Sequence, residues 1–368
     1  MKKIMTTVVI ALTSCGAFAQ QRQSVFYVSE YGSDQADGTS AVTAFKTLER
    51  GRNAARASGA DASILIAGRF LLTSPLQLTA ADKGLTLASA AGKTVALLAS
   101  QGARSAIAID GADGVQLRNL HISGFAADGI LARNAVDLRI IRNTVTDTRS
   151  TSWSQGAIHL TGTVRGAVLQ GNVVKGADYA GIIVDTTATS DVSDVQIKEN
   201  TVTDTCRRVS DCGAIYVNDR GRRSTGIVIA NNVVNGFGPP TSAGRAIYLD
   251  DWASGVSVRN NSISGPGRYA FQIHGGRGNR LDSNSVDLRA IDSTLLVEPA
   301  KGGRWEDLSG NILTNNRFDL AGRATPPALS KKAIPSAAYP LLTGNRSCIK
   351  GVCSPYAIRP VASNSLPD

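Results

Sequence analysis

The sequence has few aromatic residues, 5% of its 368 positions, and only three histidines. Its five cysteines do not combine with histidine in the spacing of a zinc site, so we expect no metal centre of that kind. Basic residues do not form long runs interleaved with aromatic ones, the pattern that nucleic-acid binding favours. Beyond the N-terminal segment there is no apolar run long enough to cross a membrane. These absences argue against a nucleic-acid partner and against a transmembrane segment.

The first 19 residues have the pattern of a secretory signal. Two lysines precede an apolar stretch at residues 4–12, and Ala-Phe-Ala at residues 17–19 provides a small-x-small cleavage site. The segment "LTSC", which ends at Cys15, is also similar to a lipoprotein-processing box, and a lipid anchor there is the alternative. We therefore expect a secreted or periplasmic protein.

Four cysteines remain once the signal is removed, and they form two close pairs, Cys206 with Cys212 and Cys348 with Cys353. Each pair can close a small loop as a disulfide in an oxidising compartment, although four unpaired thiols are the alternative. The net charge of +10 favours an acidic partner, or is simply that of a basic secreted surface.

Glycine is abundant, at 37 residues, and the apolar residues are mostly Val, Ile, Leu and Ala, which suits many short strands with tight turns. Eight segments share one alternating pattern around a single position, about 28 residues apart. That position is occupied by Leu120, Asn143, Asn172, Asn200, Asn232, Asn261, Asn284 and Asn316. A second set of short alternating segments lies between them, beginning at Gly129, Ala157, Gly181, Ala214, Ala246, Ala270 and Thr294.

Two alternating families of strands at this period predict an all-β fold, a right-handed parallel β-helix. Each turn of the chain forms one rung, and the rungs stack about 4.8 Å apart. The recurring asparagines are expected to stack at an inward bend, where their amides bond to each other and to the backbone. Residues 26–59 predict a cap with a short helix, and the β-helix domain is expected over residues 20–321. Residues 322–368 are expected to form an irregular tail closed by the second cysteine pair.

The opening segment and the asparagine-marked turns resemble the secreted bacterial right-handed β-helix proteins of the pectate-lyase-like superfamily. The resemblance covers about Phe26 to Leu320. It implies the fold but not one reaction, because this fold carries lyases, hydrolases, epimerases and non-catalytic fibres.

Strand alternation predicts which side chains of the second family point outward, and we expect these to face water. Stacked in register, they form two columns. The first column is His159, Ile183, Tyr216, Tyr248, Gln272 and Leu296. The second is Thr161, Asp185, Asn218, Asp250, His274 and Glu298, directly followed in the chain by Asp219, Arg220, Asp251, Trp252 and Arg277. For Asp185 and Glu298, an ordinary role at a strand end is the alternative.

Neighbouring carboxyls raise one another's pKa, which keeps one of them an acid near neutral pH. Asp219, Asp250 and Asp251 are close enough along the chain and across the predicted rungs for this effect. Trp252 and the two tyrosines of the first column offer flat apolar surfaces to sugar rings. The other predicted substrate contacts are Asn218, Gln272, Arg220, Arg277, Glu298, Asp185 and His159.

Asn218-Asp219, Asp250-Asp251 and His274-Gly275 are similar to motifs of the polygalacturonase-type inverting hydrolases, in the same order. The first motif lacks the middle residue of Asn-x-Asp. Val297-Glu298-Pro299 stands where that family has Arg-x-Lys. The resemblance implies that the three aspartates share the acid and water-activating roles and that His274 orients them. The departures leave recognition of a uronate open. Because Asp251 points inward on an ideal strand, the strand must bend after Asp250.

Three functions follow as hypotheses, all with a polysaccharide or oligosaccharide partner and a monomeric protein. The first is a glycoside hydrolase without a cofactor. The second is a polysaccharide lyase that uses Arg220, Arg277, His274 or Tyr248, with calcium held by the aspartates. The third is a non-catalytic glycan-binding surface protein.

Overall fold

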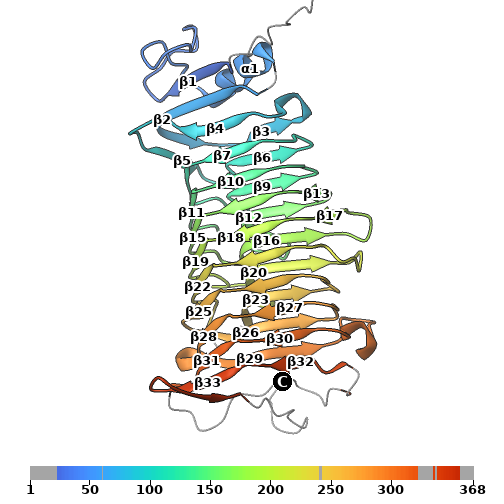
Figure 1. The fold of residues 1–368 in the computed structure, drawn as a ribbon. Coiled ribbons are helices and arrows are strands. Elements are labelled where there is room, and N and C mark those ends of the chain that lie inside the picture. The colour runs from blue at the N-terminus through green and yellow to red at the C-terminus, as the bar shows by residue number, and fades with distance from the viewer. Residues whose placement is uncertain (1–22, 60, 240–242, 322–334, 336–337, 357–368) are drawn as a thin grey trace, which may run out of the picture.

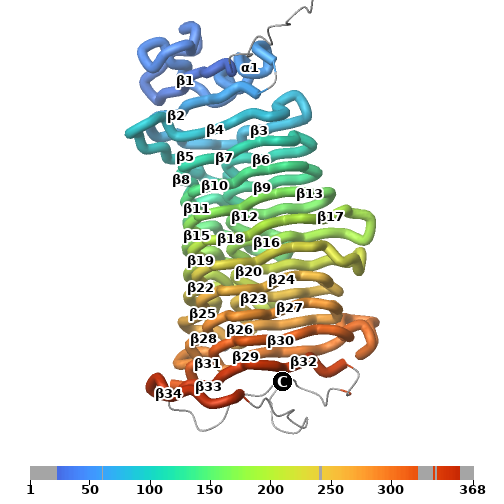
Figure 2. The backbone as a smooth tube through the Cα atoms, viewed as in Figure 1, coloured from blue at the N-terminus to red at the C-terminus, as the bar shows by residue number. Residues whose placement is uncertain are grey.

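Each turn of the chain supplies three short strands, and equivalent strands of successive turns pair in parallel, so the turns stack into a long solenoid (Figures 1 and 2). This computed structural model describes residues 23–59, 61–239, 243–321, 335 and 338–356. The predicted signal segment and Cys15 lie outside these residues. Within them, no helix is long and apolar enough to cross a membrane.

Two faces of the solenoid consist mainly of very short strands, and β2 belongs to both. The strands of the first face are β1 (Val25–Ser29), β2 (Ser63–Leu72), β4 (Thr86–Ser89), β7 (Gln116–Arg118), β10 (Arg139–Ile141), β14 (Val168–Gln170), β18 (Gln196–Lys198), β21 (Val228–Ala230), β24 (Ser257–Arg259), β27 (Arg280–Asp282), β30 (Ile312–Thr314) and β32 (Leu341–Thr343). Those of the second face are β5 (Val95–Ala99), β8 (His121–Ser123), β11 (Thr144–Thr146), β15 (Val173–Lys175), β19 (Thr201–Thr203), β22 (Val233–Asn235), β25 (Ser262–Ser264), β28 (Ser285–Asp287), β31 (Arg317–Asp319), β33 (Arg346–Ile349) and β34 (Val352–Pro355).

The third face, which we call the long-strand face, has nine strands in the described part of the chain. They are β3 (Leu76–Thr79), β6 (Ile107–Asp110), β9 (Ile130–Arg133), β12 (Gly156–Thr161), β16 (Ala180–Thr186), β20 (Cys212–Asp219), β23 (Gly244–Asp250), β26 (Gly267–His274) and β29 (Ile291–Glu298). A small pair of strands, β13 (Val164–Arg165) and β17 (Val192–Ser193), and the 3-10 helices η1 (Ala80–Asp82), η3 (Leu288–Ala290) and η4 (Trp305–Leu308) lie in the connections.

The asparagine column occupies the bend between the first two faces, as predicted. The residue before each asparagine has a positive φ, for example 57° at Asn231 and 56° at Asn260, which turns the chain sharply. Asn232 shows the repeating pattern. Its Oδ1 accepts from the backbone N and the Nδ2 of Asn200, both at 2.9 Å. Its Nδ2 donates to the carbonyl of Ile197 and to Oδ1 of Asn261, again at 2.9 Å. Side-chain amides therefore tie each turn to the next.

A short helix closes the N-terminal end of the stack. Helix α1 (Leu48–Ser58) covers the first turn, packing Leu48 and Ala54 into the core. Its N-cap Thr47 accepts from the N–H of Arg50 at 3.2 Å. Gly51 is required there, because a Cβ would lie 2.6 Å from Cγ2 of Val28. The predicted N-terminal cap is confirmed.

The solenoid extends beyond the predicted boundary at residue 321. Strands β32 and β33 pair in parallel with β30 and β31, and Asn345 continues the asparagine column through a 2.9 Å bond from the N–H of Asn316. The segment "LLTGN" carries the repeat signal, which the change to Pro- and Ser-rich composition concealed. The expected tail therefore contains a further partial turn, and the Cys348–Cys353 disulfide lies in its β33–β34 hairpin.

Replacing Asn232 with Ala should lower the melting temperature markedly. The change leaves the buried N–H of Asn200 without its acceptor, at a cost of about 1–3 kcal/mol, and removes one donor from the carbonyl of Ile197. The matched control is Asn235→Ala on β22, where the side chain is exposed and the effect should stay within about 0.5 kcal/mol. Equal melting temperatures for the two variants would contradict the stabilising role of the column.

Candidate functional site

The predicted outer columns are in register across the long-strand face. His159, Ile183, Tyr216 and Tyr248 are aligned on successive strands, and Gln272 and Leu296 follow. In the second column Asp185, Asn218 and Asp250 are aligned, and His274 is aligned with Glu298. Sequence positions 24 to 34 residues apart thus become direct neighbours.

The turn after β23 brings two adjacent aspartates to the same side. β23 ends at Asp250, and Asp251 and Trp252 follow with φ values of 41° and 67°. This left-handed pair of residues confirms the bend that the Asp-Asp pair requires. The backbone N–H of Asp251 donates to Oδ1 of Asp250 at 2.7 Å, which fixes the first carboxylate against the turn.

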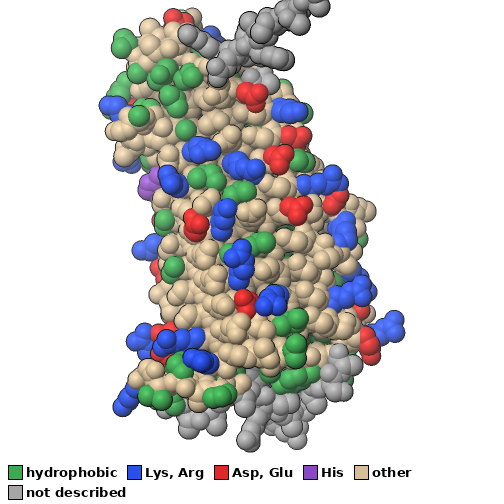
Figure 3. All heavy atoms as spheres, viewed as in Figure 1, with side chains coloured by type: hydrophobic (Ala, Val, Ile, Leu, Met, Phe, Trp, Pro, Cys, Tyr) green, Lys and Arg blue, Asp and Glu red, His purple; other side chains and the backbone are tan. Residues whose placement is uncertain are grey.

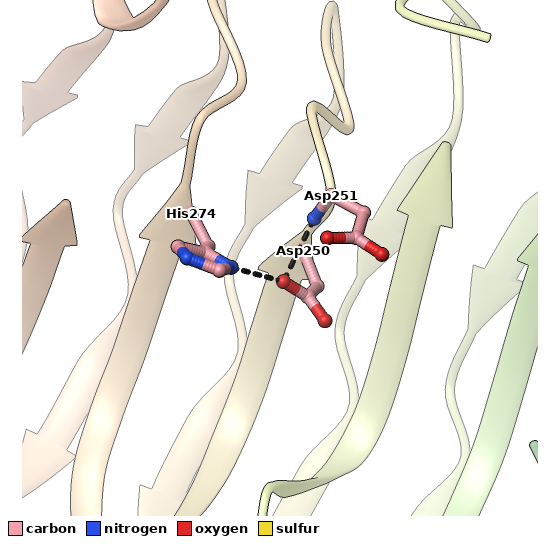
Figure 4. A group of neighbouring side chains, drawn as sticks. All are labelled: Asp250, Asp251 and His274. Carbon is pink, nitrogen blue, oxygen red and sulfur yellow. Dashed lines mark hydrogen bonds and ion pairs between the residues drawn. The ribbon is translucent and has the colours of Figure 1, made fainter. Parts of the chain in front are cut away.

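His274, at the end of β26, completes a group of three side chains (Figure 4). Its Nδ1 lies 2.5 Å from Oδ1 of Asp250, and the second oxygen of Asp250 accepts from the hydroxyl of Tyr216. The His274 ring points at Asp250 from the neighbouring strand, while the Asp251 carboxylate lies on the other side of Asp250. One ligand atom from each of the three residues lies within 4.8 Å of the others.

A guanidinium connects this group to the preceding turns. Arg220 Nε donates to Oδ2 of Asp251 at 2.8 Å, and its NH1 lies 3.9 Å from Oδ1 of Asp185. Asn218 holds Asp185 through an Nδ2 bond of 2.7 Å. Arg220 remains half-exposed, so a charged side chain borders the acid group on the solvent side.

The two aspartates have opposite electrostatic environments. Burial raises the pKa of Asp251, and the charge of Asp250 raises it further, against the opposing effect of Arg220. Burial also acts to raise the pKa of Asp250, but the hydrogen bonds and charge of His274 and the hydroxyl of Tyr216 outweigh it, so this pKa is lowered. For His274, burial acts to lower the pKa, but Asp250 and the more distant Glu298 and Asp251 raise it overall.

The expectation that Tyr216 and Tyr248 offer flat surfaces to sugars is corrected. Their exposed fractions are 5% and 2%, and their rings stack on each other with centroids 4.8 Å apart. The loop closed by the predicted Cys206–Cys212 disulfide packs over this part of the sheet, together with Tyr179. The outer side of the long-strand face is therefore a second, smaller core rather than a water-facing surface.

Asp219 does not join the group of Asp250, Asp251 and His274. It is 1% exposed, and its carboxylate accepts from Thr186 Oγ1 at 3.1 Å and from the N–H groups of Gly221 and Arg223 at 3.0 and 2.8 Å. These bonds hold the turn after β20. Since Asp219 follows Asn218 directly, strand alternation points the two side chains in opposite directions.

The remaining predicted site residues differ in burial, and of those described below only Arg277 is exposed. His159 is buried, and its Nδ1 lies 3.1 Å from Oδ1 of Asp128. Gln272 is also buried and donates to Oε1 of Glu298 at 2.8 Å. Trp252 is partly buried under the guanidinium of Arg222, 4.1 Å from its ring centroid. Arg277 is exposed, three residues after His274.

Sequence reasoning missed Asp211 and Arg245, which hold the outer side of the sheet together. Arg245 NH1 lies 3.0 Å from Oδ1 of Asp211, and its Nε donates to Gln272. The backbone carbonyl of Asp211 accepts from the hydroxyl of Tyr179 at 3.0 Å. Arg245 lies directly before the predicted strand that begins at Ala246, and its neighbours in the chain do not indicate that it is buried beside an acid.

The group of three offers two carboxylates and an imidazole, whereas calcium prefers six to eight oxygen ligands. Both oxygens of Asp250 already accept protein hydrogen bonds. These contacts favour proton chemistry at Asp250. Basic side chains are scattered over the face in Figure 3 and mixed with acidic ones, which agrees with a generally basic surface there.

Residues 105–286 match the family described as right handed beta helix region. Among solved structures, the GH136 lacto-N-biosidase from Eubacterium ramulus has a TM-score of 0.54 at 12% identity, over 89% of this chain and 67% of that one. The alginate lyase AlyF-OU02 in complex with G6 has a TM-score of 0.51 at 13% identity, over 81% of this chain and 61% of that one. ORF18 of Geobacillus virus E2 has a TM-score of 0.50 at 11% identity, over 79% of this chain and 54% of that one. No curated protein matches the chain.

These likenesses confirm the right-handed parallel β-helix that the sequence predicted. This chain spans between 54% and 67% of the length of the three structures. Several of the similar folds belong to carbohydrate-active enzymes, both hydrolases and lyases.

The Asp250–His274 pair should make stability depend on pH. Because the pKa of Asp250 is lowered on folding, Asp250 stabilises the fold at pH values above the pKa it has in the unfolded chain. Because the pKa of His274 is raised on folding, His274 stabilises the fold at pH values below its pKa in the unfolded chain. The stabilisation is lost as pH falls through the folded pKa of Asp250 or rises through that of His274. The difference in melting temperature between wild type and His274→Gln should therefore be largest at about pH 4 to 6.5. His121→Gln, at an exposed position, is the control, and a pH-independent difference for His274→Gln would contradict the pairing.

Proposed function

We propose that this protein is a carbohydrate-active enzyme, a glycoside hydrolase that cleaves a polysaccharide or oligosaccharide on the outer side of the long-strand face. The observation that carries the proposal is the group of Asp250, Asp251 and His274. In it, two neighbouring carboxyls have pKa values shifted in opposite directions. Such a divergence separates the acid from its ionised partner in known carboxylate enzymes.

In this proposal Asp251 is the general acid. Its raised pKa retains the proton to higher pH, and its side chain is the more accessible of the two, 20% against 7% exposed for Asp250. Asp251 would donate its proton to the glycosidic oxygen as the C–O bond breaks, while the ionised carboxylate of Asp250 bonds to the anomeric carbon. Water would then cleave this glycosyl ester and return the proton to Asp251. Arg220, bonded to the same carboxylate, would orient it and help to stabilise it after the proton has left.

Asp250 is the ionised partner, held by His274 and Tyr216. One carboxylate oxygen of Asp250 and one of Asp251 lie within 4.8 Å, below the separation of about 6.5–9.5 Å that inverting enzymes need to admit a water. This pair therefore favours retention of configuration, unlike the inverting enzymes that the motifs resemble. Inversion would require a more distant second carboxylate.

β-Elimination of a uronic-acid polymer is the second candidate, because exposed Arg277 follows His274 closely and could neutralise a substrate carboxylate. The alginate lyase with a similar fold adds to this possibility only as a likeness. Tyr248 is too deeply buried to act as the base, whereas His274 and Arg220 are partly exposed.

The purified protein should release products from at least one polysaccharide in a panel of neutral and acidic polymers. Replacing Asp251 with Asn, or Asp250 with Asn, should lower kcat/KM by about 10² to 10⁴ because the proton donor or its ionised partner is lost. Asp110→Asn is the matched control, an exposed aspartate at the same end of a strand on the long-strand face, and should retain activity.

Mass analysis of the products distinguishes the candidates. Hydrolysis adds one water to each cleaved linkage, whereas elimination leaves an unsaturated end that absorbs in the ultraviolet. Full activity in both Asp250→Asn and Asp251→Asn would remove these residues from the mechanism. Binding without any product would favour a non-catalytic glycan-binding protein.

A further inference from the structure

Tyr216 contacts the candidate site from inside the protein. Its ring is almost fully buried on β20, and its hydroxyl donates to Oδ2 of Asp250 on the next strand. The other oxygen of Asp250 receives His274 Nδ1 at 2.5 Å and the N–H of Asp251 at 2.7 Å. The carboxylate thus sits between a neutral donor on one oxygen and an imidazole on the other.

Aromatic packing fixes the position of the Tyr216 hydroxyl. Its ring is stacked on Tyr248 with centroids 4.8 Å apart and an interplanar angle of 9°, and Tyr179 contacts it edge-on at 6.2 Å. Since a rotation of this ring would clash with both neighbours, the hydroxyl cannot leave Asp250 at little cost.

The Cys206–Cys212 loop anchors the tyrosines in turn. Its Asp211 accepts from the Tyr179 hydroxyl at 3.0 Å through the backbone carbonyl and from the Tyr248 hydroxyl at 3.3 Å through Oδ1. The guanidinium of Arg245 lies over the Tyr248 ring at 4.4 Å. A covalently closed loop therefore holds the layer that holds Tyr216.

We propose that Tyr216 is a positioning residue, which fixes Asp250 and sets how tightly that carboxylate holds the proton it shares with His274. The proposal rests on the function proposed above for the reaction, but the proton equilibrium itself can be measured without a substrate.

Other charged and titratable groups also face this pair. Asp251 and Arg220 lie on the solvent side, Glu298 lies beyond His274 on β29, and Asp185 lies on β16. Tyr179 and Tyr248 lie on the buried side, and Asp211 is an exposed residue of the loop that covers them. Replacing Tyr216 with Phe leaves all of these side chains in place and removes one hydroxyl.

The test is the pH titration of His274 by histidine-selective NMR. The chain has only three histidines, and His274→Gln assigns the signal. Without the Tyr216 hydroxyl, Asp250 loses a donor and attracts the imidazolium more strongly, so the titration of His274 should move to higher pH in Tyr216→Phe. The signals of His159 and His121 should not move.

Tyr269→Phe is the matched control, because Tyr269 is also buried on the outer side of the long-strand face but does not contact Asp250. A fluorinated tyrosine at position 216 keeps the packing and is a stronger donor, so it should move the titration to lower pH. This second variant keeps the test decisive if Tyr216→Phe does not fold. A His274 titration that stays unchanged in a folded variant overturns the proposal.

With an active substrate, Tyr216→Phe should lower kcat about tenfold with little change in KM, and its pH–rate profile should move in the same direction as the titration. A loss of kcat without any movement of the profile would indicate a merely structural role and would overturn the proposal. If the titration moves but the wild type acts on no glycan, the role of Tyr216 stands and the proposed hydrolase function fails.

Discussion

Register between turns is the constraint on which the site depends. Asparagines in the middle of the column, such as Asn232, accept two bonds from the turn before them and donate to the turn after them. A slip of one turn against the next would therefore break several buried hydrogen bonds together. Because this ladder fixes one edge of every turn, residues on the long-strand face meet at defined neighbours. Asp250 and His274, 24 residues apart in sequence, owe their contact to it.

The outer side of the long-strand face explains how a flat sheet can support acid chemistry. Exposed carboxylates on a bare sheet would be surrounded by water and have nearly ordinary pKa values. Here the disulfide-closed loop and three tyrosines remove water from one side of Asp250, while the turn at Asp251 leaves the other side open. Each aspartate therefore has a different environment, although they are adjacent in the chain.

The sequence predicted the turns, the asparagine column, the disulfide pairs and the alignment of the outer columns, because these follow from a repeat and a period of two. It did not predict what covers the sheet. Alternation indicates on which side a residue lies, but the burial of Tyr216 and Tyr248 depends on a loop between strands that carries no repeat. For the same reason the sequence does not show that Asp219, part of the motif-like Asn218-Asp219, holds a turn through its carboxylate.

Two adjacent aspartates can have different chemical roles only if the backbone conformation places their carboxylates in different environments. Asp250 is the last residue of a regular strand, so its carboxylate lies between His274 and Tyr216 of the two neighbouring strands and receives their hydrogen bonds. Asp251 is the first residue of a left-handed turn and so comes to the same side, where its partner is a flexible, half-exposed arginine. An extended backbone at Asp251 would point its carboxylate into the core. The end of β23 is thus the feature that separates an ionised carboxylate from a proton-retaining one.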